Sequence, residues 1–291
     1  MNAVLADLLH LLELERIEEN IFRGESRDIG SPQVFGGQVL GQALTAANYT
    51  VDGRRVHSLH AYFLRPGDVT APIVYDVDRA RDGKSFSNRR VVAIQHGRAI
   101  FNMTASFQAA ESGLEHQIDM PDVPGPEGLP DQSEVSARAA EQLPTKLRRY
   151  LMQERPFQFR SVEPINLLLP VKTAPRRHVW LKTVDAVGDD ARLHRNLLAY
   201  VSDYQLLATA MLPHGVHFEH GNAQMASLDH ALWFHRPFRV DEWLLYALES
   251  PNATGARGLA RGHFFARDGR LVASTAQEGL IRIWPEVASQ D

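Results

Sequence analysis

The sequence predicts an α+β protein made of two tandem copies of one unit, in which an antiparallel sheet wraps around a central helix. An internal repeat is the first observation. HSLHAYFLRPGDV (57–69) recurs as ASLDHALWFHRPFRV (226–240), roughly 170 residues further on, a period that indicates a duplicated domain rather than a solenoid. The second observation is a matching hairpin turn downstream in each copy, HGR (96–98) and DGR (268–270).

Each copy contains a helix-like segment followed by strand-like segments. GGQVLGQALTAANY (36–49) is the first predicted central helix, because its apolar residues share one helical face. SDYQLLATAML (202–212) is its expected counterpart, and its first two residues, serine and aspartate, favour a helix N-cap. RRVVAIQHGRAIFNMTASFQ (89–108) and ARGHFFARDGRLVASTAQEGLIRI (260–283) are predicted hairpins.

These elements predict an N-terminal unit over residues 1–110, a linker over 111–150 and a C-terminal unit over 151–291. The linker is placed by ESGLEHQIDMPDVPGPEGLPDQSE (111–134), whose prolines and acids are typical of a connection. The first residues, MNAVLADLLHLLELERIEENIF, combine leucines at helical spacing with acids. A surface helix is therefore expected there rather than a signal peptide.

Composition restricts the class of protein. With 44% hydrophobic and 23% charged residues, the 291-residue chain is expected to be a soluble globular protein with a sizeable core. Its net charge of −4 gives no overall attraction to nucleic acid. No apolar run approaches the ~20 residues of a membrane span. The chain has no cysteine, which excludes disulfides and thiolate metal sites. Without a signal peptide or a membrane span in the sequence, a cytoplasmic location is expected.

The stretch MASLDHALWFHRPF (225–238) contains the residue types of a serine-hydrolase triad. On a strand, however, Ser227 and Asp229 point to one face and His230 to the other, so the three cannot align. The chain also has no Gly-x-Ser-x-Gly elbow at this serine. A triad within this stretch is therefore not predicted.

Three histidines at a spacing of three, His214, His217 and His220, form a possible metal site. Glycines and a proline surround them, so the segment is interpreted as a loop. In a loop, the spacing of three does not place the histidines on one face. No metal site is predicted.

The tripeptide GKS (83–85) resembles the end of a phosphate-binding loop, but Asp78 stands where that motif requires its first glycine. Lys84, Arg89 and Arg90 could still contact a phosphate as point charges. A solvated hairpin edge explains these residues equally well.

Six stretches, in order along the chain, together resemble the TesB-like acyl-CoA hydrolases, the acyl-CoA thioesterase II family: SPQVFGGQVLGQAL, VHSLHAYFLRPGD, DGKSFSNRRVVAIQHG, SDYQLL, SLDHALWFHRPF and STAQEGLIR. The resemblance extends from about residue 10 to 285. It implies the double hotdog fold, which agrees with the repeat. It also implies hydrolysis of acyl-CoA to fatty acid and CoA without a metal or cofactor. The edge strands of such sheets predict a homodimer or homotetramer.

The resemblance places the family's water-activating residues on Asp203, Ser227 and Gln277. Serine stands where threonine is commoner in the family, and without the methyl group its rotamer is less fixed. The aspartate would accept the water's proton, and backbone N–H groups at a helix N-terminus would stabilise the oxyanion. Gly36 and Gly37 let the backbone approach a ligand. The first copy has no acid matching Asp203, so that half is expected to serve binding.

The candidate substrate-binding residues are Gly36, Gly37, Lys84 and Arg89. Two alternatives to hydrolysis are a non-catalytic acyl-CoA binding protein and a hotdog enoyl-CoA hydratase or dehydratase. A hydratase or dehydratase of this fold usually requires an Asp–His pair at a helix start, and no histidine adjoins Asp203 in the sequence. A protein that only binds acyl-CoA has no use for the aspartate, serine and glutamine together.

Overall fold

The computed structural model describes residues 1–140, 142, 148, 151–164, 171–216 and 223–284. Its N-terminal half contains α1 (Ala3–Leu12), β1 (Glu15–Glu18), β2 (Ile21–Gly24), α2 (Gly36–Asn48), β3 (Arg55–Phe63), β4 (Ile73–Asp82), β5 (Phe86–Gln95) and β6 (Arg98–Gln108). Its C-terminal half contains α3 (Gln132–Ala140), β7 (Phe157–Ser161), β8 (Arg176–Thr183), α5 (Ala191–Ser202), the 3₁₀-helix η1 (Leu207–His214), β9 (Ala223–Ser227), β10 (Asp229–Phe234), β11 (Leu244–Thr254), β12 (Arg257–Ala266) and β13 (Leu271–Ile283).

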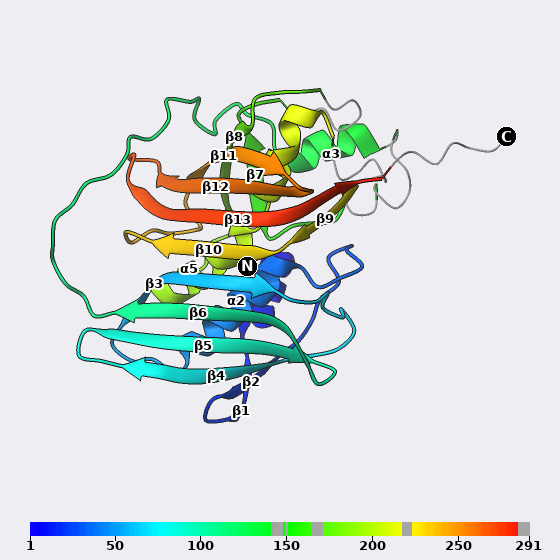
Figure 1. Ribbon diagram of the computed structural model, residues 1–291. Coiled ribbons are helices and arrows are strands. Elements are labelled where there is room, and N and C mark those ends of the chain that lie inside the picture. Colours follow the sequence, from blue (N-terminus) through cyan, green and yellow to red (C-terminus); the bar gives the residue numbers. More distant parts are fainter. Residues whose placement is uncertain (141, 143–147, 149–150, 165–170, 217–222, 285–291) are drawn as a thin grey trace.

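The described strands form one 13-stranded antiparallel sheet in the order β1-β2-β4-β5-β6-β3-β10-β13-β12-β11-β8-β7, with β9 paired to β13. The order is nearly symmetrical about the β3–β10 pair, where Leu59 lies opposite Leu232. The repeated sequence segments run along these two central strands and a few residues beyond them. Each half therefore contributes its own sheet, and the two sheets join edge to edge, which satisfies the backbone groups of both edges (Figure 1).

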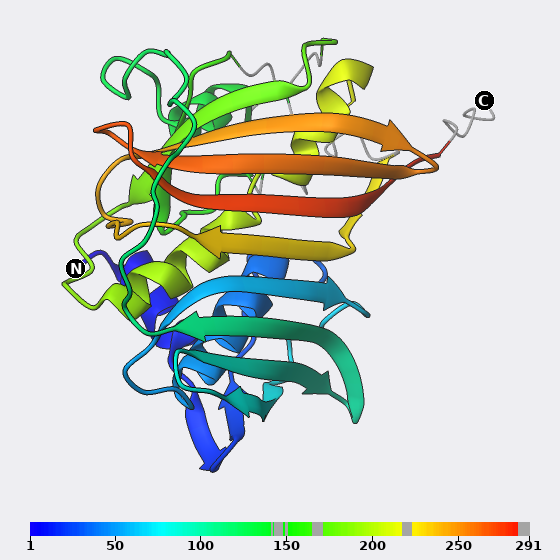
Figure 2. The same ribbon diagram turned by 60° about the vertical axis from the view of Figure 1, so that its left-hand side comes forward.

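The curved sheet encloses the two central helices, α2 and α5, which pack side by side (Figures 1 and 2). The pair is antiparallel: the N-terminal residues of α2 lie against the C-terminal end of α5. Polar contacts also join the helices, since Asn196 Nδ2 donates to Thr45 Oγ1 at 2.9 Å and Asn48 Nδ2 donates to Asn196 Oδ1 at 2.8 Å. Almost every residue of α2 is buried, as expected for a helix wrapped by a sheet.

Several predicted elements are confirmed. The helix predicted over 36–49 is α2, and the N-terminal amphipathic helix is α1, with its leucines packed into the core. The predicted hairpins over 89–108 and 260–283 are β5–β6 and β12–β13. No helix among the described residues is long and apolar enough to cross a membrane.

The helix predicted over 202–212 is wrong. The central helix of the second half is α5, which ends at Ser202, and the residues after it form a turn and then η1. The true N-cap is Asp190, whose Oδ1 accepts a hydrogen bond from the Arg192 backbone N–H at 2.8 Å. Asp203 is consequently a C-terminal neighbour of a central helix, not an N-cap.

Candidate active site

Three polar side chains from separate elements converge at the C-terminal end of α5. Asp203 directly follows α5, Ser227 ends β9, and Gln277 lies in β13. Gln277 Nε2 donates to Asp203 Oδ1 at 2.6 Å, and Ser227 Oγ donates to the same oxygen at 3.3 Å. The structure therefore brings together the three residues that the family resemblance selected.

Gln277 leaves one polar atom of this cluster unused. Its side chain is 0% exposed, and its Oε1 has no hydrogen-bond partner among the described residues. Buried polar atoms are nearly always paired, so an orphaned acceptor beside a carboxylate is a position where a water or a substrate group would be held.

The N-terminus of α2 faces the carboxylate from the other half of the chain. A Cβ atom at Gly36 would stand 2.7 Å from Asp203 Oδ2, so only glycine allows this approach. The preceding residue, Phe35, makes no side-chain capping bond. The first N–H groups of a helix have no intrahelical acceptor and carry the positive end of the helix dipole. An anionic oxygen would be stabilised here.

Aromatic side chains border the same place. The ring of Phe35 lies 4.5 Å from that of Tyr204 and 5.2 Å from that of Tyr200, and both tyrosines flank Asp203 along the chain. Sequence reasoning missed this cluster, because Phe35 lies far from the two tyrosines in the sequence. The three rings pack on one another beside the chain segments that carry Gly36 and Asp203.

Gly37 serves a different purpose from Gly36. A Cβ atom there would clash with the carbonyl oxygen of Tyr200 and with the ring of Phe35. The close approach that Gly37 permits is thus between the two central helices.

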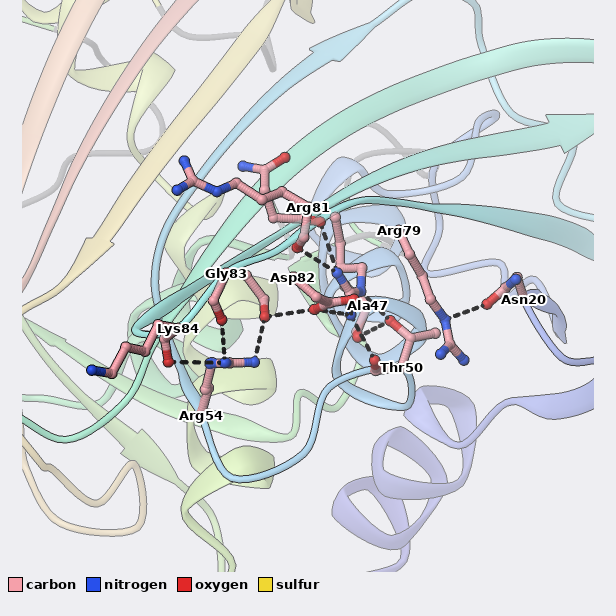
Figure 3. Close-up of polar contacts among 12 residues, drawn as sticks. Asn20, Ala47, Thr50, Arg54, Arg79, Arg81, Asp82, Gly83 and Lys84 are labelled. Carbon is pink, nitrogen blue, oxygen red and sulfur yellow. Dashed lines mark hydrogen bonds and ion pairs between the residues drawn. The ribbon is translucent and has the colours of Figure 1, made fainter.

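Arg89 is not placed to bind substrate, so its assignment as a phosphate-binding residue is corrected. The side chain is 2% exposed and points inward from β5. Its guanidinium donates to Thr50 Oγ1 at 2.9 Å, to the Thr50 carbonyl at 3.0 Å and to Asp82 Oδ1 at 2.8 Å. Through these bonds Arg89 anchors the β4–β5 hairpin to the C-terminal end of α2. Arg54 does the same by donating to the Gly83 carbonyl at 2.6 Å (Figure 3). Hydrogen bonds from Ser87 and then Arg89 lower the pKa of Asp82.

Lys84 lies in the exposed turn of that hairpin, and its side chain extends away from the contacts in Figure 3. The hairpin stands at the opposite end of α2 from Gly36, a separation of about 20 Å along a 13-residue helix. The structure does not bring Lys84 to the cluster around Asp203.

The Ser227-to-His230 stretch forms no catalytic triad, because its side chains bind different partners. His230 contacts Ser202 Oγ at 2.9 Å through Nε2 rather than Ser227, and Asp229 Oδ1 accepts the Glu278 backbone N–H at 2.6 Å. His214 ends η1 instead of lying in a loop, which corrects that part of the interpretation. His217 and His220 lie outside the described residues. Among the described residues, no group of three or more histidines and acids is arranged to hold a metal ion.

Comparison with known proteins finds matches over most of the chain. The family model for acyl-CoA thioesterase matches residues 149–280, and the model for the acyl-CoA thioesterase N-terminal domain matches residues 23–108. Acyl-CoA thioesterase 2 of Haemophilus influenzae is 46% identical over 283 residues, covering 97% of this chain and 99% of that protein.

Solved structures show the same architecture. The acyl-CoA thioesterase II TesB2 from Mycobacterium marinum superimposes with a TM-score of 0.78 at 44% identity, covering 96% of this chain and 99% of that one. A protein with a hot dog fold from Alicyclobacillus acidocaldarius gives a TM-score of 0.75 at 17% identity, covering 95% of this chain and 98% of that one. The structure is therefore a double hotdog. The chain belongs to the acyl-CoA thioesterase family.

Proposed function

We propose that this protein hydrolyses acyl-CoA thioesters to a free fatty acid and CoA by direct attack of water. The observation that supports this proposal is the meeting of Asp203, Ser227 and Gln277 opposite the N-terminus of α2. The family relatives are named as acyl-CoA thioesterases, which identifies the substrate class. No metal or cofactor enters the proposed reaction.

The polar cluster can orient one water. Asp203 Oδ1 already accepts hydrogen bonds from Gln277 and Ser227, which fixes the carboxylate plane. Oδ2 remains to accept the water's proton, while the unused Gln277 Oε1 accepts its second hydrogen. A thioester carbonyl is electrophilic and thiolate is a good leaving group, so a positioned water is a sufficient nucleophile.

The first half of the chain would stabilise the developing charge. As the water oxygen bonds to the carbonyl carbon, the carbonyl oxygen becomes an oxyanion, and the N–H groups at the start of α2 can donate to it. Such a donor is worth roughly 3 kcal/mol of transition-state stabilisation. The C–S bond then breaks, and the proton held by Asp203 can pass to the departing sulfur. Each half therefore has its own role in one shared site.

The proposed activity is tested by incubating the protein with palmitoyl-CoA and a thiol-reactive dye in buffer containing EDTA. If the protein hydrolyses the thioester, the dye reacts continuously at a rate proportional to the enzyme concentration, because each turnover releases one CoA thiol. A protein that only binds acyl-CoA would show saturable binding without thiol release. An enoyl-CoA hydratase would consume crotonyl-CoA without releasing thiol. Either of these results would overturn the proposal.

We further expect a homodimer or homotetramer. The sheet ends in the edge strands β1 and β7, and unpaired strand edges tend to be covered. Large apolar side chains also stand on the outside, with Tyr62 58% exposed and Leu64 45% exposed. Light scattering at micromolar concentration should give two or four times the 32.6 kDa of one chain. A mass of one chain at that concentration would contradict this expectation.

A further inference from the structure

A buried network of hydrogen bonds lies directly behind Asp203 and is centred on the preceding residue, Ser202. The Ser202 Oγ donates to the Ala199 carbonyl at 2.9 Å and meets His230 Nε2 at 2.9 Å. The Ser202 carbonyl accepts from Tyr246 Oη at 2.9 Å, and that hydroxyl lies 2.9 Å from Thr275 Oγ1. None of these four side chains is more than 3% exposed.

The network joins the elements that carry the proposed catalytic residues. Ser202 immediately precedes Asp203, and Thr275 lies two residues before Gln277 on β13, so both threonine and glutamine project from the same face. His230 lies on β10, which follows the strand that ends at Ser227. The bonds therefore connect backbone segments next to all three proposed catalytic side chains.

Packing fixes the position of the Tyr246 hydroxyl. The ring stacks on Phe264 with centroids 3.8 Å apart and planes 12° apart. Gly262 also lies against the ring, since a Cβ atom there would clash with the tyrosine and stand 2.8 Å from Thr275 Oγ1. Only glycine at this position of β12 leaves room for the tyrosine.

The protonation states suit a fixed scaffold. Burial lowers the pKa of His230 to about 4, partly opposed by the charge of Asp203, so the imidazole is neutral at physiological pH. Burial likewise raises the pKa of the Tyr246 phenol, which remains a hydrogen-bond donor. Because Ser202 Oγ donates to Ala199, the hydrogen-bond network assigns the His230 proton to Nε2.

The last carbonyls of a helix have no intrahelical donor and are free to fray unless a side chain binds them. Here Tyr246 binds the Ser202 carbonyl, and His230 binds the Ser202 hydroxyl. We propose that Tyr246 and His230 are positioning residues that hold the end of α5 so that the Asp203 carboxylate stays between Gln277 and the N-terminus of α2. This inference rests on the proposed role of Asp203 in thioester hydrolysis.

Tyr246→Phe tests the inference because it removes one hydroxyl and keeps the packed ring. We expect kcat to fall about tenfold with KM within about twofold, since a misaligned base lowers turnover more than binding. Hydrogen–deuterium exchange of the backbone over residues 199–206 should also become faster. The matched control is Tyr75→Phe: Tyr75 is equally buried in the first half, and its hydroxyl donates to Gln42 Oε1 at 2.7 Å. That variant should lose similar thermal stability without either effect.

A second pair of variants keeps the test open if Tyr246→Phe folds poorly. His230→Leu removes the donor to Ser202, whereas His230→Gln places an amide N–H near the position of Nε2. We expect His230→Leu to reproduce the loss of kcat and the faster exchange, and His230→Gln to restore both in part. A purely structural role would change the melting temperature alone.

The two readouts separate this inference from the proposed activity. If the wild-type protein released no thiol but exchange over 199–206 still accelerated only in Tyr246→Phe, the positioning role would stand and the proposed activity would fail. If Tyr246→Phe matched Tyr75→Phe in both kcat and exchange, the positioning role would be wrong.

Discussion

Replacing Asp203 by asparagine is expected to lower kcat for acyl-CoA hydrolysis by at least ~100-fold, because an amide cannot accept the proton of the attacking water. Asparagine keeps the shape of the side chain and an oxygen that can accept the bond from Gln277 Nε2. Asp203 caps no helix N-terminus, so no capping bond is lost, and the fold should be retained. Initial rates of CoA release, together with circular dichroism and thermal melting, measure both effects.

Asp229→Asn is the matched control for this variant. Asp229 lies close to Ser227 in sequence, and its Oδ1 accepts the Glu278 backbone N–H at 2.6 Å, a bond that asparagine can also accept. Its kcat should remain within a few-fold of wild type. If Asp203→Asn turned over acyl-CoA at a near-normal rate while folded, Asp203 would not be the base.

Gly37→Ala is expected to destabilise the fold by about 3 kcal/mol, the upper part of the usual range for overpacking a core. Helix propensity alone predicts the opposite sign, since alanine is favoured over glycine by about 1 kcal/mol within a helix. At this position, however, the added methyl group would strike the Tyr200 carbonyl oxygen in the neighbouring central helix. Backbone atoms in a buried helix pair cannot move aside as a flexible side chain can, so the clash dominates.

Equilibrium unfolding in urea measures this change. Gly113→Ala provides the control, because nothing lies within 4 Å of the position of its Cβ atom. Substitutions at such open surface sites usually change the free energy of unfolding by less than about 0.5 kcal/mol. A Gly37→Ala protein as stable as wild type would show that α2 and α5 are not in the close contact described here.

Much of the fold is predictable from local pattern. The aromatic parts of the repeated segments lie on β3 and β10, and each Arg-Pro pair comes just after its strand, because the duplicated halves meet at equivalent central strands. The two hairpins are predictable since strand alternation and glycine turns are local properties.

The position of the second central helix was not predictable in the same way. Its sequence contains the buried polar residues His194, Arg195 and Asn196, which obscure the apolar stripe. Asn196 is buried because it bonds to Thr45 and Asn48 of the other helix, a partner far away in the sequence. Because the two central helices are antiparallel, Asp203 at the end of α5 lies opposite Gly36 at the start of α2. The two residues therefore do not occupy equivalent positions in the two copies of the repeat.

The site residues came from family resemblance, and their convergence is a tertiary property. Asp203, Ser227 and Gln277 lie on a helix end and two strands, so neither spacing nor periodicity could bring them together. The inward position of Arg89 did have a local signal. Arg89 is two residues from Ser87 and from Val91 on β5, so the three side chains share one face of the strand. Ser87 and Val91 are buried, which places the Arg89 side chain on the core face.

The most direct test of the proposal that Asp203 and Gln277 act on one water is a mutant cycle on kcat. The cycle uses Asp203→Asn, Gln277→Ala and the double variant, each shown to be folded by circular dichroism. Residues that serve one event are strongly non-additive, so we predict that the double variant is about as slow as Asp203→Asn alone. If the two losses of kcat instead multiplied in the double variant, the residues would act independently, and the single shared water would be contradicted.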